Sequence, residues 1–389
     1  MRFRFHEGPR SPDQERVNTA IDQWWAAFRA NAPTIEAMFT AGAEFDLGAF
    51  MHRHLGNIDG RLMWEFGPPM RGGRHRLVFT PERVRHLRPL VTALLERSPR
   101  ELGFEFYFGR QAEALQQVEA AVKGRTGHEM KDWRVAVRIN EHLGLEVRVV
   151  PRREQLTDDA ILGAASVAVE GILGEQFLDE FCDSIDVSSE EERSVPFDQL
   201  AEGVRTAIET SQKTLATAPL TEFGDTLKWT MFKLEPREAE DYPHQLDLFV
   251  GKTVHVPMWR CAHSAGFSSR RFSVFGETFC FLKLDGKDAT QEGFADKSQI
   301  EDALDAVLRP ASLGAVIGGG TGLRYSYIDL ALTDVEAALP VIRERLQRGR
   351  IAKRSWLQFY DDTLAAEWVG MWPDTPAPPG LPDEPSESQ

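Results

Sequence analysis

A short stretch of the chain gathers the residue types that most readily do metal or nucleophilic chemistry. Thiolate and imidazole groups are ligands that suit zinc, and this stretch carries His255, Cys261, His263 and Cys280. Five residues separate the first two, one separates the next two and sixteen precede the last, a spacing that fits no common zinc module. Because a free cysteine is more often a small buried hydrophobe, we predict no metal and no cofactor.

Cys261 and His263 would also suit a nucleophile and its base, since an adjacent imidazole can help generate the reactive thiolate. A thiolate needs electropositive surroundings, and arginines stand nearby in the sequence: Arg260, Arg270 and Arg271. The chain has no G-x-S-x-G or H-E-x-x-H motif of a serine hydrolase or a zincin. An enzyme with its site near Cys261 and His263 is therefore an alternative, and no residue is assigned as catalytic.

A glycine cluster, Gly318 to Gly322, resembles a phosphate-binding loop at first sight. Phosphate binding of that kind requires a strand, then glycines, then a helix whose N-terminal N–H groups face the anion. Here an alternating strand follows instead of a helix, and Tyr325 occupies the position of the third glycine of G-x-G-x-x-G. The cluster predicts a tight hairpin turn or a β-bulge that needs positive φ, with a phosphate or nucleotide site as the alternative.

The strand predicted after these glycines has two chemically different faces. Alternate side chains would meet a covering helix: Ile328, Leu330 and Leu332. The opposite face would carry Tyr325, Tyr327 and Asp329, and Trp356 follows in a later strand. Tyrosine and tryptophan are frequent in protein interfaces, so these four residues are the predicted partner contacts. The alternative is that this face packs on another part of the chain, with its hydroxyl groups hydrogen-bonded.

Composition limits the classes of partner. The chain has 389 residues and a formal net charge of −15, which argues against a general nucleic-acid binder and against docking on an anionic membrane. No apolar run is long enough for a membrane span, and the first residues lack the apolar core of a secretory signal. Three cysteines without a C-x-x-C motif make no disulfide framework. We therefore expect a cytoplasmic protein.

The predicted elements follow one recurring order, in which two strands precede a helix and a third strand. This strand–strand–helix–strand (ββαβ) order is expected within three stretches: 62–108, 133–187 and 314–360. In the second of these, one long helix is expected from Thr157 to about Phe181. The expected fold class is α+β, with ferredoxin-like ββαβ units whose antiparallel sheets are covered by helices.

The predicted division of the chain has two halves. An N-terminal α+β domain with two of the units would cover residues 1–190, and a helical joint would cover 191–225. A C-terminal α+β domain would cover 226–372. Residues 373–389 are rich in proline and acidic residues and have little to bury, so a disordered tail is expected there.

Two stretches carry a resemblance to known proteins. LMWEFGPPMRGGRHRLVFTPE with HLRPLV, and IGGGTGLRYSYIDLALTD with SWLQFYDDTLAAEWVG, together cover about residues 62–90 and 317–370. They resemble segments of uncharacterised bacterial proteins with ferredoxin-like units, which occur among immunity proteins of toxin systems and among regulators of ribonuclease E activity. The resemblance implies an α+β fold and matches no motif of established role.

These observations favour a non-catalytic cytosolic binding or regulatory protein. In its most concrete form, it would act like an immunity protein or an inhibitor, and its acidic surface would speed association with a basic protein partner such as a nuclease. The alternatives are an enzyme at one of the two places described above and an assembly component that associates through exposed sheet edges. The sequence sets no oligomeric state.

Overall fold

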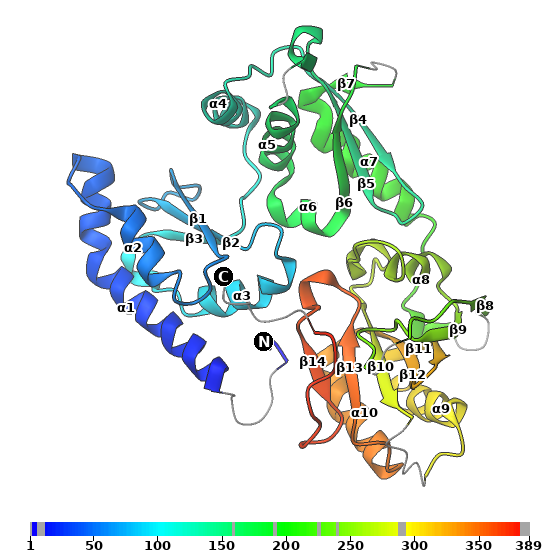
Figure 1. The fold of residues 1–389 in the computed structure, drawn as a ribbon. Coiled ribbons are helices and arrows are strands. Elements are labelled where there is room, and N and C mark those ends of the chain that lie inside the picture. Colours follow the sequence, from blue (N-terminus) through cyan, green and yellow to red (C-terminus); the bar gives the residue numbers. More distant parts are fainter. Residues whose placement is uncertain are drawn as a thin grey trace.

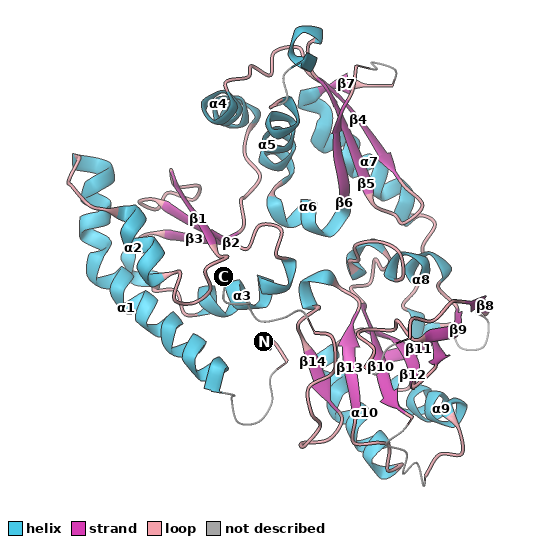
Figure 2. Cartoon of the chain, viewed as in Figure 1, coloured by secondary structure: helices cyan, strands magenta, loops and turns pink. Residues whose placement is uncertain are grey.

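The computed structural model describes residues 2–5, 12–157, 160–189, 193–223, 227–238, 241–286 and 293–381. Within them the chain is a mixed α+β protein with three sheets, in which most strand pairs are antiparallel. Figure 2 shows helices packed beside each sheet. The expected α+β class is thus confirmed. We refer to the N-terminal region (residues 12–108), the middle region (115–212) and the C-terminal region (227–381).

The N-terminal region is a three-stranded sheet covered by helices on one face (Figure 1). Strands β1 and β2 form an antiparallel hairpin, and β3 lies parallel to β2 after the α3 crossover. An aromatic core joins this sheet to α1, where Trp24 and Phe28 are fully buried. The elements are α1 (Pro12–Ala41), α2 (Leu47–His54), β1 (Met63–Gly67), β2 (Arg76–Thr80), α3 (Arg88–Glu96) and β3 (Glu105–Phe108).

The middle region repeats the order of hairpin, crossover and parallel strand. Its sheet has the order β6-β5-β4-β7, with β5 and β6 parallel. The core lies between this sheet and the helices α4, α5 and α7. The elements are α4 (Leu115–Thr126), β4 (Arg134–Ile139), β5 (Leu145–Val150), α5 (Ile161–Leu173), α6 (Glu175–Phe181), β6 (Cys182–Val187), β7 (Val195–Pro196), the short 3-10 helix η4 (Phe197–Gln199) and α7 (Leu200–Gln212).

The single long helix expected in this region is wrong. Gly174 has φ +81° and separates α5 from α6, which meet at 101°. A side chain at this position would approach the backbone of Ala112 and Arg110, so glycine permits both the positive φ and the close packing. Among the described residues, no single helix is long and apolar enough to cross a membrane, and only this bent pair reaches that length and composition.

The C-terminal region is built on a seven-stranded antiparallel sheet of order β14-β13-β10-β12-β11-β9-β8. Helices α9 and α10 cover one face, and the short α8 lies on the other. The elements are β8 (Thr230–Lys233), β9 (Leu248–Thr253), α8 (Val256–Ala262), β10 (Thr278–Asp285), α9 (Lys297–Leu308), β11 (Gly314–Gly322), β12 (Tyr325–Leu332), α10 (Val335–Arg348), β13 (Ser355–Phe359) and β14 (Trp368–Gly370).

The last predicted unit is present in its elements but not as a contiguous sheet. Strands β12 and β13 form close to the expected positions and β11 extends beyond its expected end, yet β10 lies between β12 and β13 and pairs with both. Helix α10 therefore crosses over one intervening strand, and α9 likewise crosses over β12 between β10 and β11. The central order is β13-β10-β12-β11, and the glycine-rich β11 sits deep in the sheet between β12 and β9.

Ion pairs and a backbone strap join the three regions. The Arg110 guanidinium contacts Glu65 at 3.2 Å and Glu170 at 3.0 Å, which links the first two regions. Arg271 contacts Asp183 at 2.7 Å, which links the middle and C-terminal regions. Before α1 begins, the backbone N–H groups of residues 3, 4 and 5 all donate to the buried carboxylate of Glu367 at 2.6–3.2 Å.

The end of the chain also contacts the C-terminal region. Within the stretch predicted to be a disordered tail, Trp356 Nε1 donates to the carbonyl oxygen of Pro376 at 2.6 Å, and Leu381 packs against the aromatic side chains of the sheet. Residues 382–389 lie outside the described residues. The described part of this stretch is therefore held against β13 rather than free of contacts.

Candidate functional site

The four predicted partner contacts lie together, but inside the protein. The exposed fractions are 1% for Tyr325 and 0% for Tyr327, Asp329 and Trp356. The rings of Tyr325 and Trp356 are 6.2 Å apart, on the face of the sheet opposite α9 and α10. This face of the strand therefore packs on another part of the chain, which was the alternative prediction, and none of the four side chains is available to a partner.

The segment 241–247 covers the two tyrosines and supplies hydrogen-bond partners to their hydroxyl groups. Tyr325 Oη donates to Asp241 at 2.7 Å, and Tyr327 Oη donates to the Asp247 carboxylate. Lys283, also fully buried, places its ammonium group 4.1 Å from the centre of the Tyr325 ring. Burial lowers the pKa of Lys283 to about 8. These groups form a buried, hydrogen-bonded network rather than an open site.

Asp329 is a fully buried carboxylate in this network, and only one of its two oxygens is hydrogen-bonded among the described residues. Its Oδ1 accepts a hydrogen bond from Tyr360 Oη at 2.7 Å and a longer one from Gln245 Nε2 at 3.4 Å. Its Oδ2 has no hydrogen-bond partner among the described residues. Burial raises the pKa of Asp329 to about 6, because the charged form loses its hydration. No cavity among those we describe opens onto this carboxylate.

The predicted hairpin turn at Gly318–Gly322 is wrong, because these glycines form the body of strand β11. The predicted β-bulge is confirmed, because the pairing of β11 with β12 shifts between Val316 and Gly318. A Cβ atom at Gly318 would lie 2.6 Å from Asp329 Oδ2, and one at Gly322 would overlap the Asp247 carboxylate. Gly319 has φ +137° at a β-bulge. The glycines thus make room for two buried acids, and those acids would repel a phosphate at the place that the alternative required.

The Cys/His neighbourhood is equally enclosed. Cys261 and Cys280 are fully buried, and burial raises the pKa of the Cys261 thiol to about 12. Both ring nitrogens of His255 are engaged, with Phe272 O at 3.1 Å and Met258 N at 3.3 Å. The described residues contain no group of three or more His, Cys, Asp and Glu side chains placed to hold a metal ion.

His263 is engaged at both ring nitrogens as well. Its Nδ1 lies 2.8 Å from Trp259 O and its Nε2 lies 3.1 Å from Gln245 Oε1. Burial lowers the pKa of His263. A base for Cys261 would need a free nitrogen facing the thiol, so this arrangement fits a structural role of the imidazole.

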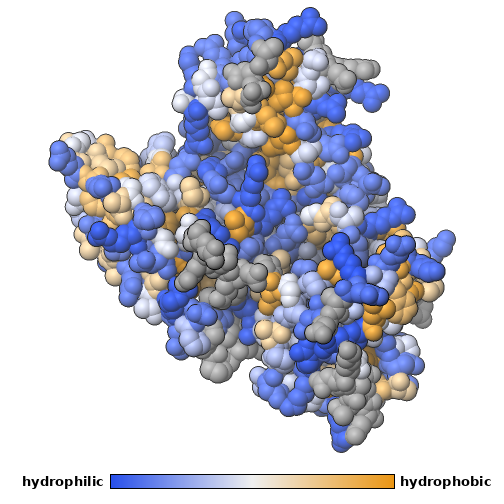
Figure 3. Space-filling model, viewed as in Figure 1, coloured by the Kyte–Doolittle hydropathy of each residue, from blue (hydrophilic) through white to orange (hydrophobic). Residues whose placement is uncertain are grey.

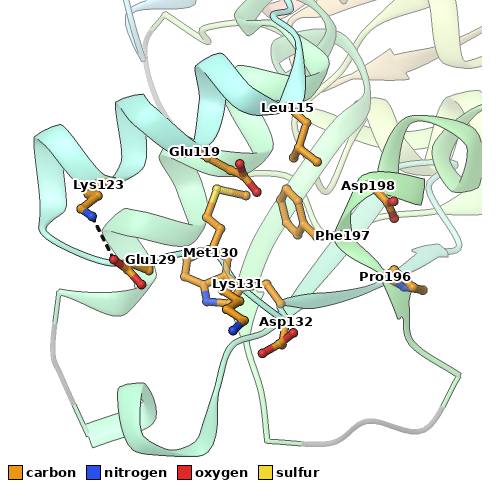
Figure 4. A pocket seen from close by; sticks show the side chains of 11 residues that line it. Leu115, Glu119, Lys123, Glu129, Met130, Lys131, Asp132, Pro196, Phe197 and Asp198 are labelled. Carbon is orange, nitrogen blue, oxygen red and sulfur yellow. Dashed lines mark hydrogen bonds and ion pairs between the residues drawn. The ribbon is translucent and has the colours of Figure 1, made fainter.

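An open pocket with mixed apolar and charged walls lies in the middle region (Figure 4). It has a volume of about 470 Å³, and we call it the α4–η4 pocket. Leu115, Met130 and Phe197 point toward its interior. The other lining residues are Glu119, Lys123, Glu129, Lys131, Asp132, Trp133, Pro196 and Asp198.

Local backbone contacts fix the apolar floor of this pocket. Helix α4 ends at Thr126 and is followed by Gly127, whose φ of +76° turns the chain toward Met130. Trp133 then holds both sides of the pocket, because its backbone N–H donates to Met130 O at 3.0 Å and its carbonyl accepts from Phe197 N at 3.1 Å. The indole Nε1–H of Trp133 donates to Gln155 at 2.8 Å, so the buried ring has its polar atom satisfied.

The charged rim is predominantly acidic. Four carboxylates and two ammonium groups line the pocket: Glu119, Glu129, Asp132 and Asp198 against Lys123 and Lys131. Lys123 pairs with Glu129 at 2.9 Å, and Asp132 pairs with Arg152 at 3.2 Å. Glu119 and Asp198 are exposed and have no ion pair among the described residues. Two carboxylates are therefore open to a cationic group from outside.

Two other hollows are larger but differ in character. One of about 850 Å³ lies where all three regions meet and is lined by α3, α6 and α10, with Arg88 in its wall. One of about 670 Å³ lies between α6 and α7, where Arg205 and Arg270 already pair with glutamates. On the face in Figure 3, hydrophilic side chains interrupt the hydrophobic areas. The larger hollow also has two exposed acids without an ion pair among the described residues, Glu96 and Glu336, but arginines stand in its wall, whereas no arginine lines the α4–η4 pocket.

Sequence reasoning missed this pocket. It placed Trp133 in a strand and Phe197 at the start of a helix, and it gave no binding role to either or to Leu115 and Met130, because the walls come from segments far apart in the chain. Comparisons with protein-family models, with curated proteins and with solved structures find no match for this chain. The arguments for function therefore rest on the molecule itself.

Proposed function

We propose that this protein is a non-catalytic binding protein that regulates or neutralises a basic protein partner by associating with it through the α4–η4 pocket. The observation that carries the proposal is the open apolar floor beside the carboxylates of Glu119 and Asp198, which have no ion pair within the described part of the chain. An apolar centre with a charged rim is the usual construction of a protein contact. The net charge of −15 adds long-range attraction for a basic partner.

Three observations favour binding over the enzyme alternative. A nucleophilic cysteine requires a lowered pKa and access to substrate, whereas burial raises the pKa of Cys261 to about 12. Both nitrogens of the His263 imidazole lie within 3.1 Å of other groups, Trp259 O and Gln245 Oε1. A phosphate or nucleotide site at Gly318–Gly322 also loses support, because Asp247 and Asp329 occupy the space beside β11.

The same proposal includes a ferredoxin-like assignment for the C-terminal region and a cytoplasmic setting. The chain order β10-α9-β11-β12-α10-β13, with β13-β10-β12-β11 as the order in space, supports a split β-α-β arrangement of that type. The resemblance to uncharacterised bacterial proteins with ferredoxin-like units agrees with a protein-binding role, because such units occur among immunity proteins and among regulators of ribonuclease E activity. Association, rather than turnover, would then be the measurable activity.

The test compares two charge-reversed variants of equal net charge. Glu119→Lys/Asp198→Lys removes the acids of the pocket, and Asp302→Lys/Glu344→Lys makes the same charge change on the exposed faces of α9 and α10. A stoichiometric partner captured from the native host would be purified and its association measured by interferometry at low and moderate salt. We expect association to slow by about tenfold or more in the pocket variant and much less in the control.

Two results would contradict the proposal. Association that does not change with salt would exclude an electrostatically guided basic partner. Equal slowing in both variants would mean that only the overall charge matters and that the pocket is not the contact. Circular dichroism and thermal unfolding would first establish that both variants fold.

A further inference from the structure

We propose that the α4–η4 pocket holds one arginine side chain of the partner, which enters with its guanidinium group toward Glu119 and Asp198. This inference rests on the proposed function and names the chemistry of its contact. The pocket of about 470 Å³ lies toward the lower end of the ~300–1,000 Å³ typical of ligand sites. That volume suits one long side chain with its backbone better than a whole helix.

The walls match the two parts of an arginine side chain. Leu115 and Met130 offer an apolar surface to the methylene stem, and the Phe197 ring stands beside them (Figure 4). A guanidinium group is planar, packs well on aromatic rings and can bind carboxylates with two parallel hydrogen bonds. Glu119, from α4, and Asp198, from η4, present such carboxylates from two sides of the pocket.

The charges already in the rim leave these two acids for the incoming group. Lys123 is held by Glu129 at 2.9 Å, and Asp132 is held by Arg152 at 3.2 Å. Lys131 adds one positive charge to the rim beside Asp132. An anionic ligand would therefore meet more carboxylates than ammonium groups, whereas a cation gains two unpaired partners.

The pocket can be occupied without any rearrangement of the three regions. Every lining residue lies between Leu115 and Asp198, within the middle region. Trp133 provides a reporter at the floor, because its indole N–H is bonded to Gln155 and its ring lines the pocket. A ligand that enters will change the surroundings of this indole.

The experiment uses four short peptides with the same flanking residues and a central arginine, lysine, citrulline or norleucine. The full chain is labelled at the indole nitrogens of its nine tryptophans, and the Trp133 signal is assigned by its loss in Trp133→Phe. We expect saturable shifts of this signal with the arginine peptide and affinity about tenfold weaker for citrulline, which keeps the shape without the charge.

Conservative variants then assign the contact. Glu119→Gln/Asp198→Asn should reduce the advantage of arginine over citrulline to about twofold or less, and Asp302→Asn/Glu344→Gln should leave it unchanged. Equal binding of arginine and citrulline, tighter binding of lysine, or no shift of Trp133 with any peptide would overturn the arginine assignment. If the peptides overturn the arginine assignment but partner association still depends on Glu119 and Asp198, the proposed function stands. If neither peptide binding nor partner association depends on Glu119 and Asp198, both the arginine assignment and the proposed function are rejected.

Discussion

The two faces of the seven-stranded sheet are formed by the same strands but bury different kinds of side chain. Toward α9 and α10, strand β12 presents Ile328 and Leu330 to a core of aliphatic side chains. Toward the segment 241–247, the alternating residues Tyr327 and Asp329 enter a network of hydroxyl, carboxylate and ammonium groups. The first face is stabilised by removing apolar surface from water, whereas the second must satisfy every polar group that it buries.

The two faces of the sheet should therefore be sensitive to different kinds of substitution. The aliphatic face depends on volume, so a smaller side chain leaves a cavity there. The polar face depends on partners and on space for carboxylates, so protonation and added methyl groups should matter there. Three changes on these two faces make the comparison testable.

The largest effect is expected on the aliphatic face. Leu330→Ala removes a fully buried side chain from the core beneath α9 and α10, which should lower the free energy of unfolding by about 2–5 kcal/mol. Leu323→Ala, at a position that is 51% exposed, should cost much less. Urea unfolding measures both, and comparable losses would mean that this face does not dominate stability.

The polar face should make the free energy of unfolding depend on pH. The pKa of Asp329 is raised to about 6 in the folded protein, so between about pH 4 and 6 the folded state keeps a proton that the unfolded state has released. The free energy of unfolding therefore falls as pH rises through this window, with a contribution on the order of 3 kcal/mol. Asp329→Asn lacks this titration and should gain stability relative to the wild type as pH rises.

The comparison for Asp329 is a difference between two unfolding curves at each pH. Asp179 and Asp361, whose pKa values are also raised to about 6 by burial, titrate in both proteins and cancel. Curves for the wild type and Asp329→Asn that stay parallel from pH 4 to 7 would show that Asp329 titrates normally, because a group with an ordinary pKa adds no extra slope in that window.

The smallest effect is expected from filling the space along β11. In Gly320→Ala the new methyl group would overlap the Val250 carbonyl and the Leu248 side chain, which should cost about 1–3 kcal/mol. Gly163→Ala on the exposed side of α5, where a Cβ meets nothing within 4 Å, should be neutral or stabilising by up to about 1 kcal/mol. Thermal unfolding of the two variants should move in opposite directions.

Sequence reasoning gave the class of fold and many elements, but fewer of the long-range placements. The alternation in residues 325–332 correctly separated Ile328 and Leu330 from Tyr327 and Asp329, because side chains of a strand alternate whatever covers them. The long helix of the middle region was wrong because Gly174 takes a positive φ against a neighbouring segment. The pocket was missed because its walls are distant in the sequence.

What the sequence by itself determined is local: which residues share a strand face, where helices alternate with strands, and how acidic the chain is. The tertiary structure alone decided that the segment 241–247 covers the tyrosines, that the glycines of β11 accommodate Asp247 and Asp329, and that α4 and η4 enclose a pocket. The physical reason is that a repeating pattern fixes the direction of a side chain, whereas burial depends on which distant segment packs against it.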